Sequence, residues 1–186
     1  KSADHAASGD FTPGDTGLRG WTIEAYADDG AGTPTDAEDG VLSAAEYAAG
    51  PVTSTGDIVG SDTTDTNGDY KLVLEPGFYV VCEVTESNTP AWTQSGPDNT
   101  KCAAGAATLE PGGHSFEMTS GDTTTHVDND FFNYLPGEKT GTKFDDHDAS
   151  GDFTTGDTGL SGWTIEAYAA AGAGPPSEAA AGVLGA

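Results

Sequence analysis

An acidic loop at residues 146–157 carries oxygen ligands at the spacing of a calcium site. Counted from its first aspartate, ligands stand at positions one, three, five, seven and twelve, with Gly151 at position six, as in an EF-hand-type loop. The ligands are Asp146, Asp148, Ser150, Asp152 and Asp157. Position twelve is an aspartate in place of the usual bidentate glutamate, which lowers the expected affinity. Because no helix pattern flanks the loop, we expect calcium to bind here on a β scaffold.

A second loop at residues 4–15 has the same design with one ligand fewer. Its ligands are Asp4, Ser8, Asp10 and Asp15. Ala6 occupies the position that Asp148 fills in the other loop. Clustered carboxylates repel one another unless a cation neutralises them, so we predict calcium in both loops. The alternative is an acidic turn that is merely solvated.

Three polar residues outside these loops fall in apolar surroundings. Glu83 lies in the run 78–84, where both faces of an alternating strand are apolar and both look buried. A carboxyl group in such a strand must be paired or neutral. Asn133 stands among aromatic residues, and Lys1 holds the place of the lysine before Phe144 in a second copy of the sequence. Taken alone, these residues predict only a buried polar pair.

The chain has two cysteines, Cys82 and Cys102. An even pair in a glycine-rich, acidic chain of secreted type favours one disulfide. The alternative is two unrelated thiols. A metal site is less favoured, because no histidine or further cysteine stands at ligand spacing.

The sequence repeats itself with an offset of 142 residues, since residues 20–27 (Gly-Trp-Thr-Ile-Glu-Ala-Tyr-Ala) recur as residues 162–169. Large, near-identical modules in tandem are typical of stalks and fibres and rare in globular enzymes. We therefore expect one complete repeat, a linker and the N-terminal part of the next repeat, at residues 1–136, 137–142 and 143–186.

Short apolar runs separated by turn signals indicate an all-β fold. The expected strands lie at residues 21–27, 69–74, 77–86, 115–119 and 127–134. Asn67-Gly68 is a turn signal before the second of these runs. Residues 43–49 predict one short helix. Many short strands with this punctuation favour a β-sandwich.

The charge excludes several classes of partner. The chain has 31 Asp plus Glu against 6 Lys plus Arg, a net charge of −25. Nucleic acid and anionic membrane surfaces need basic patches, so neither is expected as a partner. The sequence contains no apolar run of about 18 residues, so membrane insertion is not expected. Three interpretations of the acidity remain open: binding of divalent cations, solubility of a long fibre, or adaptation to high salt.

A series of motifs follows the repeat in order: Thr142-Lys143-Phe144, the acidic loop, Gly159-Leu160-Ser161-Gly162-Trp163, residues 63–70, residues 76–84 and Asp130-Phe131-Phe132-Asn133-Tyr134. In this order they resemble serine-aspartate-repeat B-type domains, which belong with the collagen-adhesin B-type, prealbumin-like surface-protein domains. The resemblance covers the whole repeat. It implies a Greek-key, Ig-like β-sandwich in tandem repeats, rigidified by calcium and placed at the cell surface.

The collagen-adhesin relatives often carry an intramolecular isopeptide bond, and the resemblance assigns its parts. Lys1 matches the lysine of the first strand, Glu83 the catalytic acid, and Asn133 the acceptor of the last strand. Two features depart from the family. Ser2 replaces the phenylalanine found at Phe144, and the cysteine pair is not a general family feature, so a disulfide could take over the stapling.

The expected function is that of a structural module in an extracellular filament, stalk or cell-surface adhesin. Its partners would be neighbouring repeats or identical subunits. The alternative is a ligand-binding adhesin module that recognises glycan or protein, with Trp92 as the candidate contact. An enzyme is not expected, because the four histidines lack partners in a recognisable triad.

We also expect residues 143–186 to be an unfinished domain. They contain a strand with Trp163 and Ile165 but no counterparts of the later strands. That strand would expose an apolar face and open edges. Either a longer chain continues into a full repeat, or a neighbouring subunit supplies the missing strands by β-augmentation.

Overall fold

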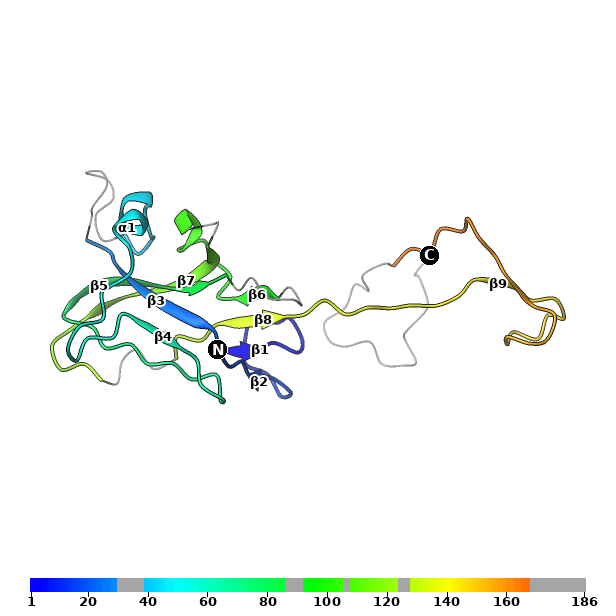
Figure 1. The fold of residues 1–186 in the computed structure, drawn as a ribbon, viewed down its shortest axis with the longest axis horizontal. Helices are drawn as coiled ribbons and strands as arrows, with labels where there is room; N and C mark the ends of the chain where they lie inside the picture. The colour runs from blue at the N-terminus through cyan, green and yellow to red at the C-terminus, as the bar shows by residue number, and fades with distance from the viewer. Residues whose placement is uncertain (30–38, 86–91, 106–107, 124–127, 168–186) are drawn as a thin grey trace. The chain divides into compact units, whose positions relative to one another are not determined.

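The computed structural model describes residues 1–29, 39–85, 92–105, 108–123 and 128–167 (Figure 1). The chain divides into two compact units, Lys1–Gly137 and Glu138–Ala186. The described residues confirm the all-β prediction, with several antiparallel sheets and one short α-helix.

The first unit contains two four-stranded sheets in a sandwich-like arrangement. One sheet has the strand order β4 (Ser61–Thr63), β3 (Thr22–Ala27), β5 (Gly77–Val84) and β7 (Leu109–Met118), and all its neighbours are antiparallel. The other has the order β2 (Thr16–Gly17), β1 (Ser2–Ala3), β8 (Phe132–Tyr134) and β6 (Thr93–Gly96). In this second sheet β1 and β8 run parallel, so the first and last strands of the unit are neighbours.

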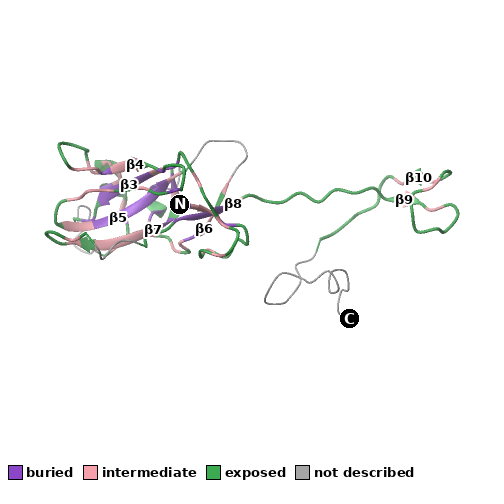
Figure 2. Ribbon diagram, turned by 90° about the horizontal axis from the view of Figure 1, so that it is seen from below, coloured by how far each residue is buried: buried purple, intermediate pink, exposed green. Residues whose placement is uncertain are grey.

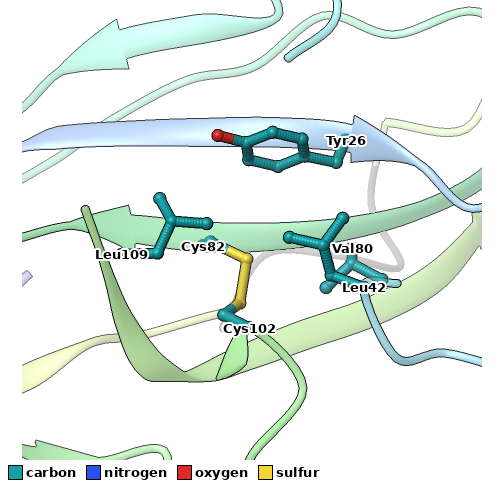
Figure 3. Close-up of a cluster of buried hydrophobic side chains, with 6 residues drawn as sticks. All are labelled: Tyr26, Leu42, Val80, Cys82, Cys102 and Leu109. Carbon is teal, nitrogen blue, oxygen red and sulfur yellow. A yellow bond between two sulfur atoms is a disulfide. The ribbon is translucent and has the colours of Figure 1, made fainter. Parts of the chain in front are cut away.

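Strand β5 lies at the centre of its sheet and is buried on both faces, as its sequence predicted; buried residues concentrate on β3 and β5 (Figure 2). The even-numbered side chains Val80 and Cys82 enter a core beneath the helix, which Figure 3 shows with its buried members Tyr26, Leu42, Val80, Cys82, Cys102 and Leu109. The odd-numbered Val81 enters a second core with Ile23, Ala25 and Phe131. Glu83 follows on the face of Val81.

The predicted short helix is α1, Ala44–Ala49. It begins with a capping box: the Ser43 hydroxyl accepts the Glu46 backbone N–H, and the Glu46 carboxylate accepts the Ser43 N–H. These reciprocal bonds satisfy two backbone donors that a helix start otherwise leaves open. A short 3-10 turn, η1, spans Ala103–Gly105.

The strand expected at residues 69–74 is not a strand. Only Val73 forms an isolated bridge, with Val59. Its neighbours Tyr70, Leu72 and Leu74 are half-buried and pack against the second core. The apolar alternation that suggested a strand therefore reflects contact with the core, since alternation does not require a ladder partner.

The described residues of the second unit form a small antiparallel pair, β9 (Phe144–Asp145) with β10 (Thr158–Gly159). The Phe144 and Phe153 rings meet edge to face, with their centroids 5.5 Å apart. Among the described residues of this unit, Trp163 and Ile165 lie outside any strand and are 62% and 77% exposed. The exposure agrees with the expectation for the second copy, but the strand expected to carry Trp163 and Ile165 is not formed at residues 163–167.

Candidate functional site

Lys1, Glu83 and Asn133 come together between the two sheets. The β1–β8 register places Ala3 opposite Asn133, which brings the preceding Lys1 to the same end of the sheet. Glu83 reaches them from β5, where it lies opposite Ile23. All three are buried: Lys1 is 4% exposed, and Glu83 and Asn133 are fully enclosed.

The three side chains form one hydrogen-bonded group. The Lys1 Nζ donates to Glu83 Oε1 at 2.8 Å and also contacts Asn133 Oδ1. The Asn133 Nδ2 donates to the same Glu83 Oε1 at 2.8 Å. One carboxyl oxygen therefore faces both the lysine nitrogen and the amide nitrogen. The other side of the Lys1 Nζ faces the ring of Trp21, 4.1 Å from its centroid.

Burial dominates the electrostatics of this group. Desolvation raises the pKa of Glu83 above its ordinary value, although the lysine and the two hydrogen bonds act in the opposite direction. A buried ion pair pays a large desolvation cost, which a neutral amine and a neutral acid avoid. A proton can therefore pass from the Lys1 Nζ to Glu83 at lower cost than in water, leaving the lysine nucleophilic.

One contact of this group, with Gln94, was not predicted from the sequence, and neither was the partner of Trp92, which was expected to pack on the sheet edge. The Gln94 Nε2 lies 3.4 Å from Glu83 Oε2, and Trp92 meets Trp21 edge to face with a centroid distance of 6.2 Å. Trp92 is half-buried, so it packs on Trp21 as part of the module. The polar run of β6 gives no hydrophobic pattern that would have identified it as a strand beside Asn133.

Cys82 and Cys102 form a disulfide, as predicted. It joins β5 to the segment before η1, across 20 residues of sequence and a Cα–Cα distance of 5.9 Å (Figure 3). Both cysteines are fully buried in the core beneath α1. The disulfide lies on the face of β5 opposite Glu83, so the two sites use alternate residues of one strand.

The loop at residues 146–157 gathers three of its predicted ligands. Carboxylate oxygens of Asp146, Asp148 and Asp157 all lie within 4.8 Å of one another, so this group could hold a metal ion. The predicted ligand Asp152 is not among these three carboxylates. Ser150 lies beside them: its backbone N–H donates to Asp146 Oδ1 at 2.9 Å, and its hydroxyl donates to the Asp152 backbone carbonyl at 3.1 Å. Hydrogen bonds, led by the Ser150 hydroxyl, lower the pKa of Asp148, and backbone N–H groups of Thr154 and His147 lower that of Asp157. Both shifts favour the ionised forms of Asp148 and Asp157, which a hard cation requires.

The loop at residues 4–15 uses its aspartates differently. Asp4 is buried and accepts the Ser95 hydroxyl at 2.6 Å and the Gly9 N–H at 2.7 Å. Burial raises the pKa of Asp4, but these hydrogen bonds outweigh burial and hold the pKa below its usual value. Asp15 accepts the N–H groups of His5 and Thr12. Within the described residues, these carboxylates are not gathered as those of the later loop are, so calcium here stays a prediction.

Comparison with protein-family models, curated proteins and solved structures finds no match to this chain. In the part of the chain that the structure describes, no helix is long and apolar enough to cross a membrane. The functional assignment therefore depends on the geometry of the sites themselves.

Proposed function

We propose that residues 1–136 form a structural module of an extracellular filament, stalk or cell-surface adhesin, with a Greek-key, prealbumin-like topology. The module locks itself with an isopeptide bond between Lys1 and Asn133. The observation that carries this proposal is the enclosed group in which Glu83 Oε1 lies 2.8 Å from both the Lys1 Nζ and the Asn133 Nδ2.

The chemistry follows from these contacts. Transfer of a proton from the Lys1 Nζ to Glu83 leaves a neutral amine, which attacks Cγ of Asn133. In the tetrahedral intermediate, Glu83 gives a proton to the departing Nδ2 and takes one from Nζ. The Nζ–Cγ bond forms, the Cγ–Nδ2 bond breaks, and one ammonia leaves. Glu83 ends protonated, because it keeps the proton that it first took from the Lys1 ammonium.

This chemistry supports a structural function and not turnover. Each module holds one lysine and one asparagine at the site, and both are consumed in forming the bond. The product is a cross-link between β1 and β8 in an enclosed interior, where water has little access to reverse the reaction. The disulfide adds a second covalent tie, and it is consistent with an extracellular location, since disulfides persist in oxidising compartments.

Calcium in the loop at residues 146–157 would rigidify the region that follows the linker. The three gathered carboxylates support a divalent cation, and the all-oxygen ligand set of the loop favours calcium over softer metals. Because residues 143–186 repeat the start of the first module, we propose neighbouring repeats or identical subunits as partners.

Intact-mass spectrometry of the reduced, denatured whole chain tests the cross-link. We expect the measured mass to fall short of the sequence mass by one ammonia, and a branched peptide joining Lys1 to Asn133 after digestion. The variant Glu83→Gln keeps the size of the side chain but removes its acid function, so it should retain the full sequence mass. A wild-type chain at full mass would refute the proposal.

A further inference from the structure

Gln94 is held in a fixed position beside the group formed by Lys1, Glu83 and Asn133. It lies in β6 directly opposite Asn133. Its Oε1 accepts the Gly112 backbone N–H at 2.8 Å, and its Nε2 lies 3.3 Å from the Gly112 carbonyl. The same Nε2 is 3.4 Å from Glu83 Oε2. The Gly112 N–H fixes which end of the amide is the oxygen, so an N–H donor faces Glu83.

The two oxygens of Glu83 therefore have different surroundings. Oε1 faces the Lys1 Nζ and the Asn133 Nδ2, between which a proton must pass. Oε2 faces the Gln94 Nε2. A proton on Oε2 would point toward the Gln94 N–H, which would then lose its acceptor. Such a proton would also be too far from the Asn133 Nδ2, which must receive it. The donor at Oε2 thus favours the proton on the oxygen that performs the transfer.

We propose that Gln94 is a positioning residue for isopeptide formation. Its amide fixes the rotation of the Glu83 carboxyl group and keeps the mobile proton on Oε1. This inference rests on the proposed cross-link, and it predicts an effect on the rate of bond formation, whereas a residue that only holds the strands together would affect stability.

Asn99 supplies a matched control. Its side chain binds the backbone of Gly113, the next residue of β7, as Gln94 binds that of Gly112. The Asn99 Oδ1 accepts the Gly113 N–H and the Nδ2 donates to the Gly113 carbonyl, both at 3.0 Å. The Asn99 side chain makes its hydrogen bonds with Gly113 and with the Lys101 N–H, and none of them reaches Lys1, Glu83 or Asn133. Asn99→Asp therefore weakens a backbone clamp of the same kind without changing the surroundings of Glu83.

The decisive variant is Gln94→Glu. It keeps an oxygen for the Gly112 N–H, so the grip on β7 remains, but an ionised carboxylate offers no donor to Glu83 Oε2. The wild-type charges that act on Glu83, Lys1 and Glu110 of β7, are unchanged, but the variant adds a carboxylate beside Oε2. The uncharged variant Gln94→Met separates this added charge from the loss of the donor. Protonation of the carboxyl group at position 94 restores an O–H donor. The variant should therefore react slowly at neutral pH and faster as the pH falls.

The experiment follows bond formation in the whole chain after cell-free synthesis, with samples quenched in denaturant and weighed by intact-mass spectrometry. We expect Gln94→Glu to lose ammonia roughly tenfold more slowly than wild type at neutral pH, the equivalent of one lost hydrogen bond, with partial recovery in acid. Asn99→Asp should react at the wild-type rate. Gln94→Met, which has similar length and no donor at any pH, should be slow throughout.

Each outcome decides the matter. If Gln94→Glu and Gln94→Met both react at the wild-type rate, Gln94 does not position Glu83, while the cross-link itself stands. If Asn99→Asp is slowed as much as the Gln94 variants, the effect belongs to the clamps on β7 and the inference is wrong. If wild type loses no ammonia, the proposed cross-link fails and the role of Gln94 fails with it.

Discussion

The two copies of the repeated segment agree in their loops and differ in their burial. His5 donates its N–H to Asp15 at 2.8 Å, and His147 donates to Asp157 at 2.9 Å. The glycine at position six adopts a left-handed φ in both loops, 76° at Gly9 and 80° at Gly151. Such a φ suits glycine, which lacks the side chain that disfavours it. The loop conformation is therefore encoded within about a dozen residues and forms in either copy.

The residues beyond the loops differ sharply. Trp21 is 6% exposed and its equivalent Trp163 is 62% exposed, and Lys143 is exposed where Lys1 is buried. The sequence around these positions is nearly the same in both copies. What the first copy has in addition is β5, β7 and β8, which bring Glu83 and Asn133 to Lys1. The burial of Lys1 and Trp21 is thus a property of the assembled module, and the local sequence alone does not create it.

The largest expected effect separates Lys1 from Lys143. Lys1→Met should abolish the ammonia loss and lower the free energy of unfolding by about 5 kcal/mol, since a cross-link that closes a loop of this length restricts the unfolded chain strongly. Lys143→Met should change neither quantity. Intact mass and denaturant unfolding measure both, and a preserved mass deficit in Lys1→Met would show that another lysine reacts.

A second substitution pair compares the two tryptophans. Trp21→Ala removes a buried ring that packs on Lys1 and Trp92, and should destabilise the first unit by about 4 kcal/mol. Trp163→Ala removes an exposed ring and should cost less than about 0.5 kcal/mol. Denaturant unfolding followed by circular dichroism measures the difference. Equal costs would mean that Trp163 is covered in solution.

A smaller effect is expected from the first aspartates of the two loops. Asp4→Ala leaves the Ser95 hydroxyl and the Gly9 N–H without their acceptor, and should cost about 2 kcal/mol. The folded pKa of Asp4 lies below its unfolded value. This contribution is therefore complete above about pH 4, the ordinary aspartate pKa, and is lost as the pH falls through the folded value.

Wild type and Asp4→Ala should accordingly converge in stability as the solution becomes acidic. Asp146→Ala, whose site faces solvent, should destabilise the chain less at neutral pH in the absence of metal. Thermal unfolding across a pH series tests both statements. A stability gap between wild type and Asp4→Ala that persists unchanged in strong acid would contradict the assignment to the ionised carboxylate.

The smallest effect on stability, and the clearest on binding, comes from exchanging one residue between the loops. Asp148→Ala gives the later loop the alanine of the first, and should weaken its calcium affinity roughly tenfold by removing one charged ligand. Ala6→Asp gives the first loop the missing carboxylate and should strengthen binding there. Calorimetric titration of both variants measures these affinities, with magnesium as the control cation. Unchanged calcium binding in Asp148→Ala would exclude the gathered carboxylates as the site.

Much of the first unit could be predicted from local patterns. The alternation of β5 correctly placed Val80 and Cys82 on one face and Val81 on the other, because a strand buried on both sides shows apolar residues without interruption. The disulfide and the short helix were also predicted, whereas the capping box of the helix was not. The expected strand at residues 69–74 was wrong, because contact with a core produces the same alternation as a ladder.

The surroundings of Glu83 could not be predicted from local patterns, and only the family resemblance suggested that Lys1 and Asn133 lie beside it. The parallel pairing of β1 with β8 joins residues more than a hundred positions apart, and nothing in either short strand specifies it. Gln94 reaches Glu83 only because β6 lies beside β8. Contacts of this kind depend on the whole topology, so the spacing of residues in one sequence does not reveal them.

The parallel pairing of β1 and β8 has a mechanical consequence. Tension along the chain enters at Lys1 and leaves after Tyr134, so it pulls these two strands in opposite directions along their length. The load falls on bonds that lie across the pull, among them Ser2 N–H to the Phe131 carbonyl at 2.8 Å and Asp4 N–H to the Asn133 carbonyl at 2.7 Å. These bonds must yield together and not one after another. If the proposed amide joins Lys1 to Asn133, the force would bypass the residues between them, and the module would transmit tension without extending.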